Sequence, residues 1–190
     1  MFYKNILWIS LLLLMPTQKE VWVINENSSL SVNGSTNINN FACDIPSYGH
    51  TDTLNINKAT GGSILSGIIM LNVQSFDCHN KMMTADLRKT LKEKEYPQLT
   101  IRFLSLDQFS ELSSRPQFVN GLVNIKLAGV TKRFDINYQV SADAEKTIHL
   151  VSSKNINFSD FNLIPPRKLG GMIKTNDQLT VLFHLKIKSI

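Results

Sequence analysis

Apolar and polar residues alternate along much of this chain, most clearly in residues 121–140, GLVNIKLAGVTKRFDINYQV. Every second position is apolar on both sides of a turn at Gly129. Side chains on a strand point to opposite faces in turn, so this alternation predicts two β-strands, each with one apolar face. A hairpin alone is at best marginally stable in water, and its apolar face must therefore pack against further strands.

The rest of the chain supplies strands of the same kind. Residues 63–73 (SILSGIIMLNV) are apolar on both faces, which predicts a strand that is covered on both sides. A shorter alternation around Leu54 and Ile56 indicates another short strand. The other predicted strands lie at residues 21–24, 29–32, 37–45, 99–103, 148–150 and 179–187.

Beyond the second cysteine the apolar period changes from two to nearly four. Met83, Leu87 and Leu91 recur every four residues, which predicts a helix with one apolar side. Asn80 is a suitable N-cap for this helix. The helix should end before residue 96, because the residue that precedes Pro97 disfavours the α conformation.

These elements together indicate the fold class. Many short strands, one short α-helix after the cysteine-containing segment and no regular exchange of strands with helices predict an all-β protein, an antiparallel barrel or sandwich. Closing about eight strands into a barrel removes the exposed edges that an open sheet leaves. We therefore expect a closed antiparallel barrel.

The N-terminus reads as an export signal. Residues 6–15 (ILWISLLLLM) form an apolar run behind the positive charge of Lys4. About ten apolar residues are fewer than the ~20 that cross a bilayer and are typical of a signal peptide. We expect residues 1–18 to be a signal peptide and residues 19–190 to form one domain without a transmembrane span. An uncleaved anchor is the alternative, because the residues at the expected cleavage site are not small.

The chain has two cysteines, Cys43 and Cys78. An even number of cysteines in an exported chain indicates a disulfide. Two free buried thiols, or a metal site that includes His79, are the alternatives, although one histidine beside one cysteine supplies too few ligands. We expect the disulfide and no metal.

Charge and catalytic motifs exclude several function classes. The net charge of +5 comes from dispersed lysines, which predicts no nucleic-acid partner. The common nucleophile, zinc-protease, dinucleotide and phosphate-loop motifs do not occur. The four histidines are scattered and expected in solvent, and Asp160 is expected to cap a turn. We expect neither an enzyme nor a cofactor.

An apolar barrel interior can be filled by side chains or can hold one ligand. A tail of about twenty carbons gains on the order of 0.8 kcal/mol for each CH₂ buried, roughly 16 kcal/mol in total. This gain can exceed an association cost of about 4–15 kcal/mol without a charged anchor. A long-tailed ligand is therefore favoured over a small polar metabolite.

The order of segments resembles the YceI-like family. The resemblance covers roughly residues 20–190 and rests on four pieces: residues 22–32, residues 95–103 (EYPQLTIRF), residues 121–132 with their LAGVTK ending, and residues 157–166. It implies a lipocalin-like barrel that binds a polyisoprenoid or other amphiphilic lipid, as in exported bacterial proteins, and a periplasmic or secreted location. The family commonly has a histidine before a Gly-x-Phe segment in an early strand, where this chain has residues 37–43, NINNFAC.

The inward faces of the predicted strands supply the expected ligand-binding residues. The alternative is a filled barrel that acts as an envelope interaction or stress-response module, with a homodimer as a further expectation. A one-residue slip in register would exchange the two faces of a strand. The predicted lining consists of Ile69, Leu71, Ile101, Phe103, Val123, Ile125, Phe134, Ile136, Tyr138, Phe183 and Leu185.

Overall fold

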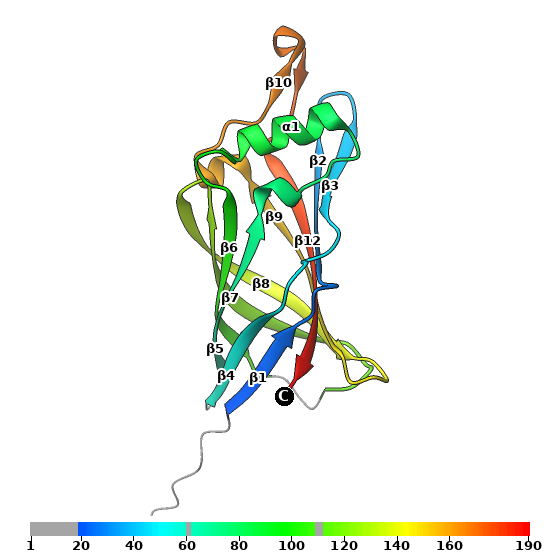
Figure 1. Cartoon of the computed structure of the whole chain (residues 1–190), viewed down its shortest axis with the longest axis vertical. Helices are drawn as coiled ribbons and strands as arrows, with labels where there is room; N and C mark the ends of the chain where they lie inside the picture. The colour runs from blue at the N-terminus through cyan, green and yellow to red at the C-terminus, as the bar shows by residue number, and fades with distance from the viewer. Residues whose placement is uncertain (1–18, 60–61, 109–111) are drawn as a thin grey trace, which may run out of the picture.

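The structure, a computed structural model, describes residues 19–59, 62–108 and 112–190. The predicted signal peptide, residues 1–18, lies outside this part of the chain. An antiparallel barrel stands upright in Figure 1, with its helix across the upper end. The strands are β1 (Lys19–Ile24), β2 (Ser29–Ser35), β3 (Asn40–Ile45), β4 (Asp52–Ala59), β5 (Gly62–Asn72), β6 (Gln98–Asp107), β7 (Gln117–Leu127), β8 (Val130–Ala142), β9 (Ile148–Asn157), β10 (Arg167–Lys168), β11 (Ile173–Lys174) and β12 (Gln178–Ser189).

Eight strands close the barrel in the order β1, β4, β5, β6, β7, β8, β9 and β12. All neighbours are antiparallel, and β12 pairs back to β1 with Ile24 opposite Ile187. Because this pairing completes the ring, the lower end of the barrel has no free edge. The predicted all-β antiparallel barrel of about eight strands is confirmed.

The edge of β12 is shared between two strands. β1 pairs with its C-terminal end, whereas β2 pairs with its N-terminal part, with Leu30 opposite Phe183. The β2–β3 hairpin therefore extends the wall only at the upper end. Within the described part of the chain, β3 meets the rest of the wall through a single bridge between Asp44 and Asp77. The sheet is therefore split between β3 and β5 at this end.

The disulfide joins the two sides of this split. Cys43 lies on β3, and Cys78 follows the short 3-10 helix η1 (Val73–Ser75). The predicted Cys43–Cys78 bond is present, with both residues buried. In the described residues, no three His, Cys, Asp or Glu side chains are grouped to hold a metal.

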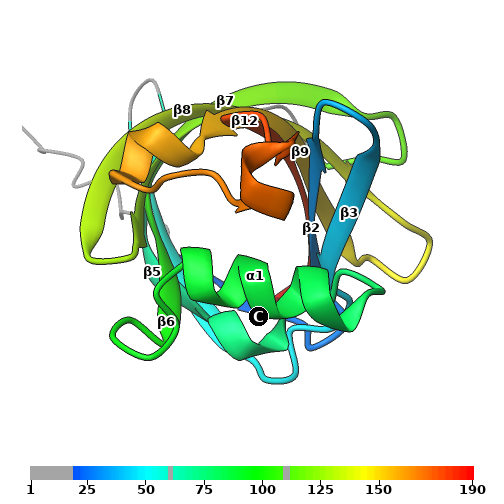
Figure 2. The ribbon, with the colours of Figure 1, turned by 90° about the horizontal axis from the view of Figure 1, so that it is seen from above.

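One α-helix, α1 (Lys81–Thr90), lies across the upper mouth of the barrel (Figure 2). Asn80 caps it, because its side chain accepts hydrogen bonds from the amides of Met82 and Met83, at 3.0 and 3.1 Å. Leu87 points into the barrel and is buried. The helix ends earlier than the predicted limit before residue 96, and turns follow it. No helix in the ranges described is long and apolar enough to cross a membrane.

The lower half of the barrel is a solid core. Trp22, Ile24, Leu54, Leu106 and Leu150 are almost completely buried there, in agreement with the alternation on their strands. One prediction about packing is wrong: β5 is not covered on both sides, because Ile64 and Met70 on its outer face are exposed to solvent.

The turns carry two further short 3-10 helices, η2 (Phe158–Phe161) and η3 (Leu169–Gly171). η2 begins where β9 ends, and η3 forms the tip of the small β10–β11 hairpin. This hairpin projects above α1 at the top of Figure 1. The hairpin turns at Gly170 and Gly171, whose positive φ angles of 64° and 95° favour glycine.

Candidate ligand-binding cavity

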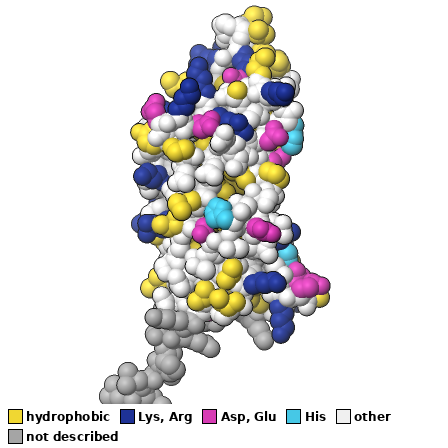
Figure 3. Space-filling view, in the orientation of Figure 1, with side chains coloured by type: hydrophobic (Ala, Val, Ile, Leu, Met, Phe, Trp, Pro, Cys, Tyr) yellow, Lys and Arg dark blue, Asp and Glu magenta, His cyan; other side chains and the backbone are white. Residues whose placement is uncertain are grey.

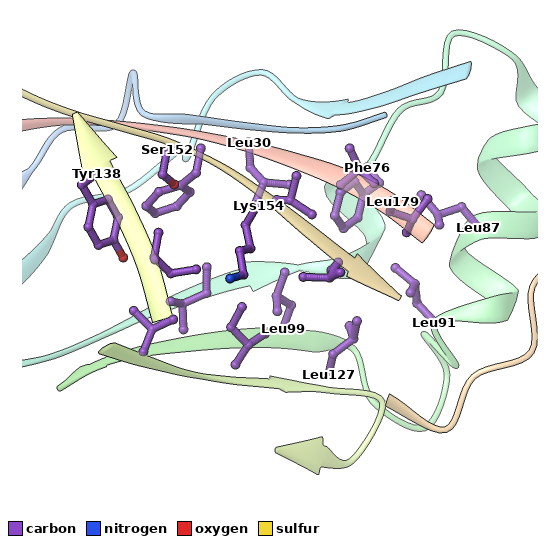
Figure 4. Close-up of a pocket in the computed structure, with 18 residues that line it drawn as sticks. Leu30, Phe76, Leu87, Leu91, Leu99, Leu127, Tyr138, Ser152, Lys154 and Leu179 are labelled. Carbon is purple, nitrogen blue, oxygen red and sulfur yellow. The ribbon is translucent and has the colours of Figure 1, made fainter. Parts of the chain in front are cut away.

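A cavity occupies the upper half of the barrel, beneath α1 (Figure 4). It leaves about 90 Å³ open to the centres of water-sized molecules. One water needs about 10–15 Å³ by this measure, so the barrel interior is not completely filled. The lining comes from β2, β6, β7, β8, β9, β12, η1 and α1 and is almost entirely apolar.

The strand register explains why these side chains converge. Ile69 on β5 lies opposite Ile101 on β6, and Ile101 lies opposite Ile125 on β7. Directly opposite residues share one face of a sheet, so the three isoleucines form a row on the inner wall. Two residues further along these strands, Phe103 on β6 lies opposite Val123 on β7, and this pair forms the next row on the inner wall.

Six of the eleven residues predicted to bind ligand line this cavity: Ile101, Val123, Ile125, Ile136, Tyr138 and Phe183. Ile69, Leu71 and Leu185 surround a much smaller space of about 10 Å³, together with Phe183. Phe103 is buried among the core residues outside both spaces. Phe134 packs against Phe161 of η2, with ring centroids 6.0 Å apart.

The residues that close the upper end of the cavity were not among the predicted ligand-binding residues. Leu87 and Leu91 at α1 and Phe76 beside η1 lie over the interior, together with Leu127 and Leu179 at the strand ends. The period-four stripe of the helix was the available signal. It indicated packing over the barrel but could not show which strands the helix covers.

Three polar side chains interrupt the apolar lining: Tyr138, Ser152 and Lys154. Tyr138 on β8 lies directly opposite Ser152 on β9, and Lys154 is the next inward residue of β9. Burial raises the pKa of Tyr138, so its phenol stays neutral and can donate a hydrogen bond. Ser152 and Lys154 continue the inward positions of Ile148 and Leu150 on β9. In the sequence alone, a serine and a lysine are assigned more readily to the outer face of a strand.

Residues weighed for catalysis have structural roles. Asp160 accepts hydrogen bonds from the amide of Asn157 and the Nζ of Lys132, both at 2.8 Å, as expected for a residue that caps a turn. The prediction that the four histidines are scattered and exposed to solvent is wrong for two of them. The rings of His149 and His184 are joined by a 2.9 Å nitrogen–nitrogen contact and are partly buried outside the cavity.

A second hollow, of about 200 Å³, lies next to the cavity at the upper end. Its walls come from the β2–β3 hairpin, α1 and the β10–β11 hairpin, and they include Phe41, Met83 and Ile173. Leu87 lines both this groove and the barrel cavity. The cavity and the groove therefore lie next to each other at Leu87 of α1.

Comparisons with known proteins identify the fold. No family model and no curated protein matches the sequence. Among solved structures, a polyisoprenoid-binding domain from Saccharophagus degradans implicated in plant cell wall breakdown matches with a TM-score of 0.65 at 14% identity, over 89% of this chain and 98% of that one. Burkholderia cenocepacia BcnA matches with a TM-score of 0.63 at 16% identity, over 85% and 96% of the two chains.

A Campylobacter jejuni YCEI protein also matches, with a TM-score of 0.50 at 15% identity, over 64% of this chain and 70% of that one. These identities are low, so the matches concern the fold. The chain has a YceI-like fold, as its segment order predicted.

Proposed function

We propose that this chain is an exported lipid-binding protein that holds a polyisoprenoid or other amphiphilic lipid in its barrel cavity. The observation that carries the proposal is a cavity inside the barrel whose wall is apolar except for Tyr138, Ser152 and Lys154. Such a wall favours a hydrocarbon tail, since each buried CH₂ contributes on the order of 0.8 kcal/mol. The Saccharophagus degradans domain, which shares the fold, is named as polyisoprenoid-binding.

The space for a long tail extends beyond the cavity. A chain that passes Leu87 enters the adjoining groove, which adds about 200 Å³ of partly apolar volume. Leu87 and Leu91 are held by one short helix rather than by a strand ladder, so their displacement does not require the barrel hydrogen bonds to break. This arrangement supports a ligand longer than the barrel cavity alone can hold.

The alternative function, a filled barrel that acts as an envelope interaction or stress-response module, requires an interior without free space. The cavity disfavours it. The Cys43–Cys78 disulfide supports a periplasmic or secreted location, because structural disulfides persist in oxidising compartments. A homodimer stays a prediction, and light scattering measures it.

Native mass spectrometry after mild purification, followed by organic extraction, tests the proposal. We expect a co-purified amphiphile, or binding of an added prenyl quinone. Ile125→Trp places a large ring in the cavity and should abolish binding. Leu182→Trp, on the exposed outer face of β12, is the matched control and should bind normally. A lipid-free protein that also fails to bind prenyl quinones contradicts the proposal, as does unchanged binding by Ile125→Trp.

A further inference from the structure

Lys154 is an inward-facing lysine that has no ion-pair partner among the residues that the structure describes. It lies on β9 between Ser152 and Ile156, and all three line the cavity. Figure 4 shows its side chain inside the cavity, between Tyr138 and Ser152 at one end and Leu87 and Leu91 at the other. None of the described residues that line this cavity is acidic, and none forms an ion pair with Lys154.

An ammonium group in such a place is unfavourable without a partner. Lys154 is only partly buried, but its ammonium group lies in an apolar cavity that supplies less solvation than water. An opposite charge on a ligand compensates for this weaker solvation of the ammonium group, since attraction between charges is stronger at low dielectric. The neutral phenol of Tyr138 and the hydroxyl of Ser152 can donate further hydrogen bonds to the same group.

We propose that Lys154 binds the anionic head of a single-chain amphiphile, a carboxylate or a phosphate monoester. This inference rests on the proposed function and specifies its ligand. The head lies at the level of Tyr138 and Ser152, and the tail runs past Leu99 toward Leu127 and α1. The ligand therefore enters with its charged end first and leaves its hydrocarbon end under α1.

Fluorescence titration with cis-parinaric acid and its neutral methyl ester, above the ordinary pKa of a carboxyl group, tests the inference. The native protein should prefer the acid by at least about tenfold, equivalent to one ion pair. Lys154→Met keeps the length and apolar stem of the side chain, and should lose this preference while ester affinity stays unchanged. Lys154→Arg, the matched control, should retain it. Displacement by palmitate or by farnesyl phosphate distinguishes a carboxylate head from a phosphate head.

The outcomes separate this inference from the proposed function. Equal affinity of the native protein for acid and ester, or a preference that survives in Lys154→Met, overturns the anionic head while the lipid-binding function stands. If neither probe binds, the anionic-head inference fails, and the lipid-binding function is decided by prenyl-quinone binding.

A second, independent observation concerns the outer tip of the molecule. Ile164, Leu169 and Met172 are 79%, 70% and 75% exposed, and they lie on the segment that forms the β10–β11 hairpin and its approach. Figure 3 shows apolar side chains at this upper tip, with Lys and Arg side chains below it. Exposed apolar side chains gathered on one short segment are typical of an interaction surface.

The hairpin is held in place rather than free. Lys168 forms an ion pair with Asp86 of α1. Asn37, in the β2–β3 turn, donates from Nδ2 to the carbonyl oxygen of Met172 and accepts from the amide of Lys174, both at 2.9 Å. Because these contacts fix the backbone, the aliphatic side chains of the tip stay directed away from the barrel.

The charge around this tip favours one kind of partner. Residues 161–176 contain no acidic residue, and Arg167 and Lys174 are cations there, whereas Lys168 is paired with Asp86 of α1. Aliphatic residues at a tip with cations beneath them match an anionic membrane surface, where the side chains enter the acyl boundary and the cations meet lipid head groups. We infer that the tip of the β10–β11 hairpin, with Leu169 and Met172, docks the mouth of the barrel on an anionic lipid surface.

Co-sedimentation with vesicles tests this docking. The full chain should bind vesicles of equal parts phosphatidylglycerol and phosphatidylcholine, bind pure phosphatidylcholine weakly, and lose affinity in high salt. Leu169→Asp with Met172→Asp should abolish binding. Phe118→Asp is the matched control, because Phe118 is 74% exposed on β7 at the opposite end of the barrel. Unchanged binding of the double variant, equal binding to both vesicles, or a dimer that the double variant dissociates overturns the inference.

Discussion

The Cys43–Cys78 disulfide is expected to be one of the largest single contributions to stability in this chain. It encloses a segment of 35 residues that contains β4, β5 and η1. In the chain-entropy model, closing a loop of this length lowers the entropy of the unfolded state by an amount equivalent to about 4 kcal/mol at 25 °C. Reduction of the bond should therefore lower the free energy of unfolding by about 4 kcal/mol.

The effect should also have a local part. Across the split between β3 and the segment after β5, only two backbone hydrogen bonds accompany the disulfide in the described structure, between Asp44 and Asp77 at 2.7 and 2.9 Å. Two such bonds contribute about 1–3 kcal/mol together, less than the disulfide. Reduction should therefore increase amide hydrogen exchange at Asp44 and Asp77 before it affects the closed lower half of the barrel.

Urea unfolding of the oxidised and the reduced native protein measures the total effect. With an m-value of about 2 kcal/mol/M, the midpoint should fall by roughly 2 M. Cys43→Ala with Cys78→Ala is the matched control, since it also removes the packing of two buried sulfur atoms and should lose somewhat more stability than reduction does. A loss below about 1 kcal/mol on reduction would refute the reasoning, because the loop would then be restricted already in the unfolded chain.

Three further predictions concern single positions. Burial, then the charges of His149 and Lys186, lower the pKa of His184, so stability should be complete above pH about 6.5 and fall as the pH decreases toward the folded-state pKa; His184→Gln should flatten this part of a plot of unfolding free energy against pH. Asn80→Ala removes the cap of α1 and should cost about 1 kcal/mol in urea unfolding. Gly121→Ala should cost about 1–3 kcal/mol by thermal unfolding, because its Cβ would lie 2.8 Å from the Ser105 carbonyl oxygen.

The alternation of apolar residues was sufficient to predict most strands. The β7–β8 hairpin, predicted from residues 121–140, is present with Val123 opposite Phe134. Local patterns could not predict how the barrel closes, because β1 and β12 are at opposite ends of the sequence. They also could not predict that β1 and β2 share one edge of β12, since this depends on where the chain leaves the sheet.

The candidate site was predicted less completely, and for identifiable reasons. Alternation indicates which side chains point inward but not their height along the barrel, so Phe103 was assigned to the cavity although it belongs to the core. On β6 the cavity is lined by Leu99 and Ile101, and Phe103 lies one inward position further along the strand. Lys154 was missed because a polar residue at an inward position has no distinctive sequence pattern. Its position becomes clear only when β9 is paired with its neighbours.

The two ends of the barrel differ in a way that restricts the path of a ligand. At the lower end, β1 pairs with both β4 and β12, so any opening there must break strand hydrogen bonds around Trp22 and Ile24. At the upper end, α1 is attached mainly by side chains, including the Arg88–Phe76 hydrogen bond of 2.9 Å and the Lys168 ion pair with Asp86. Side-chain contacts of this kind contribute about 0.2–3 kcal/mol each, whereas a strand ladder must be broken cooperatively. Exchange of ligand should therefore occur beneath α1, the same end at which the exposed aliphatic tip and its cations lie.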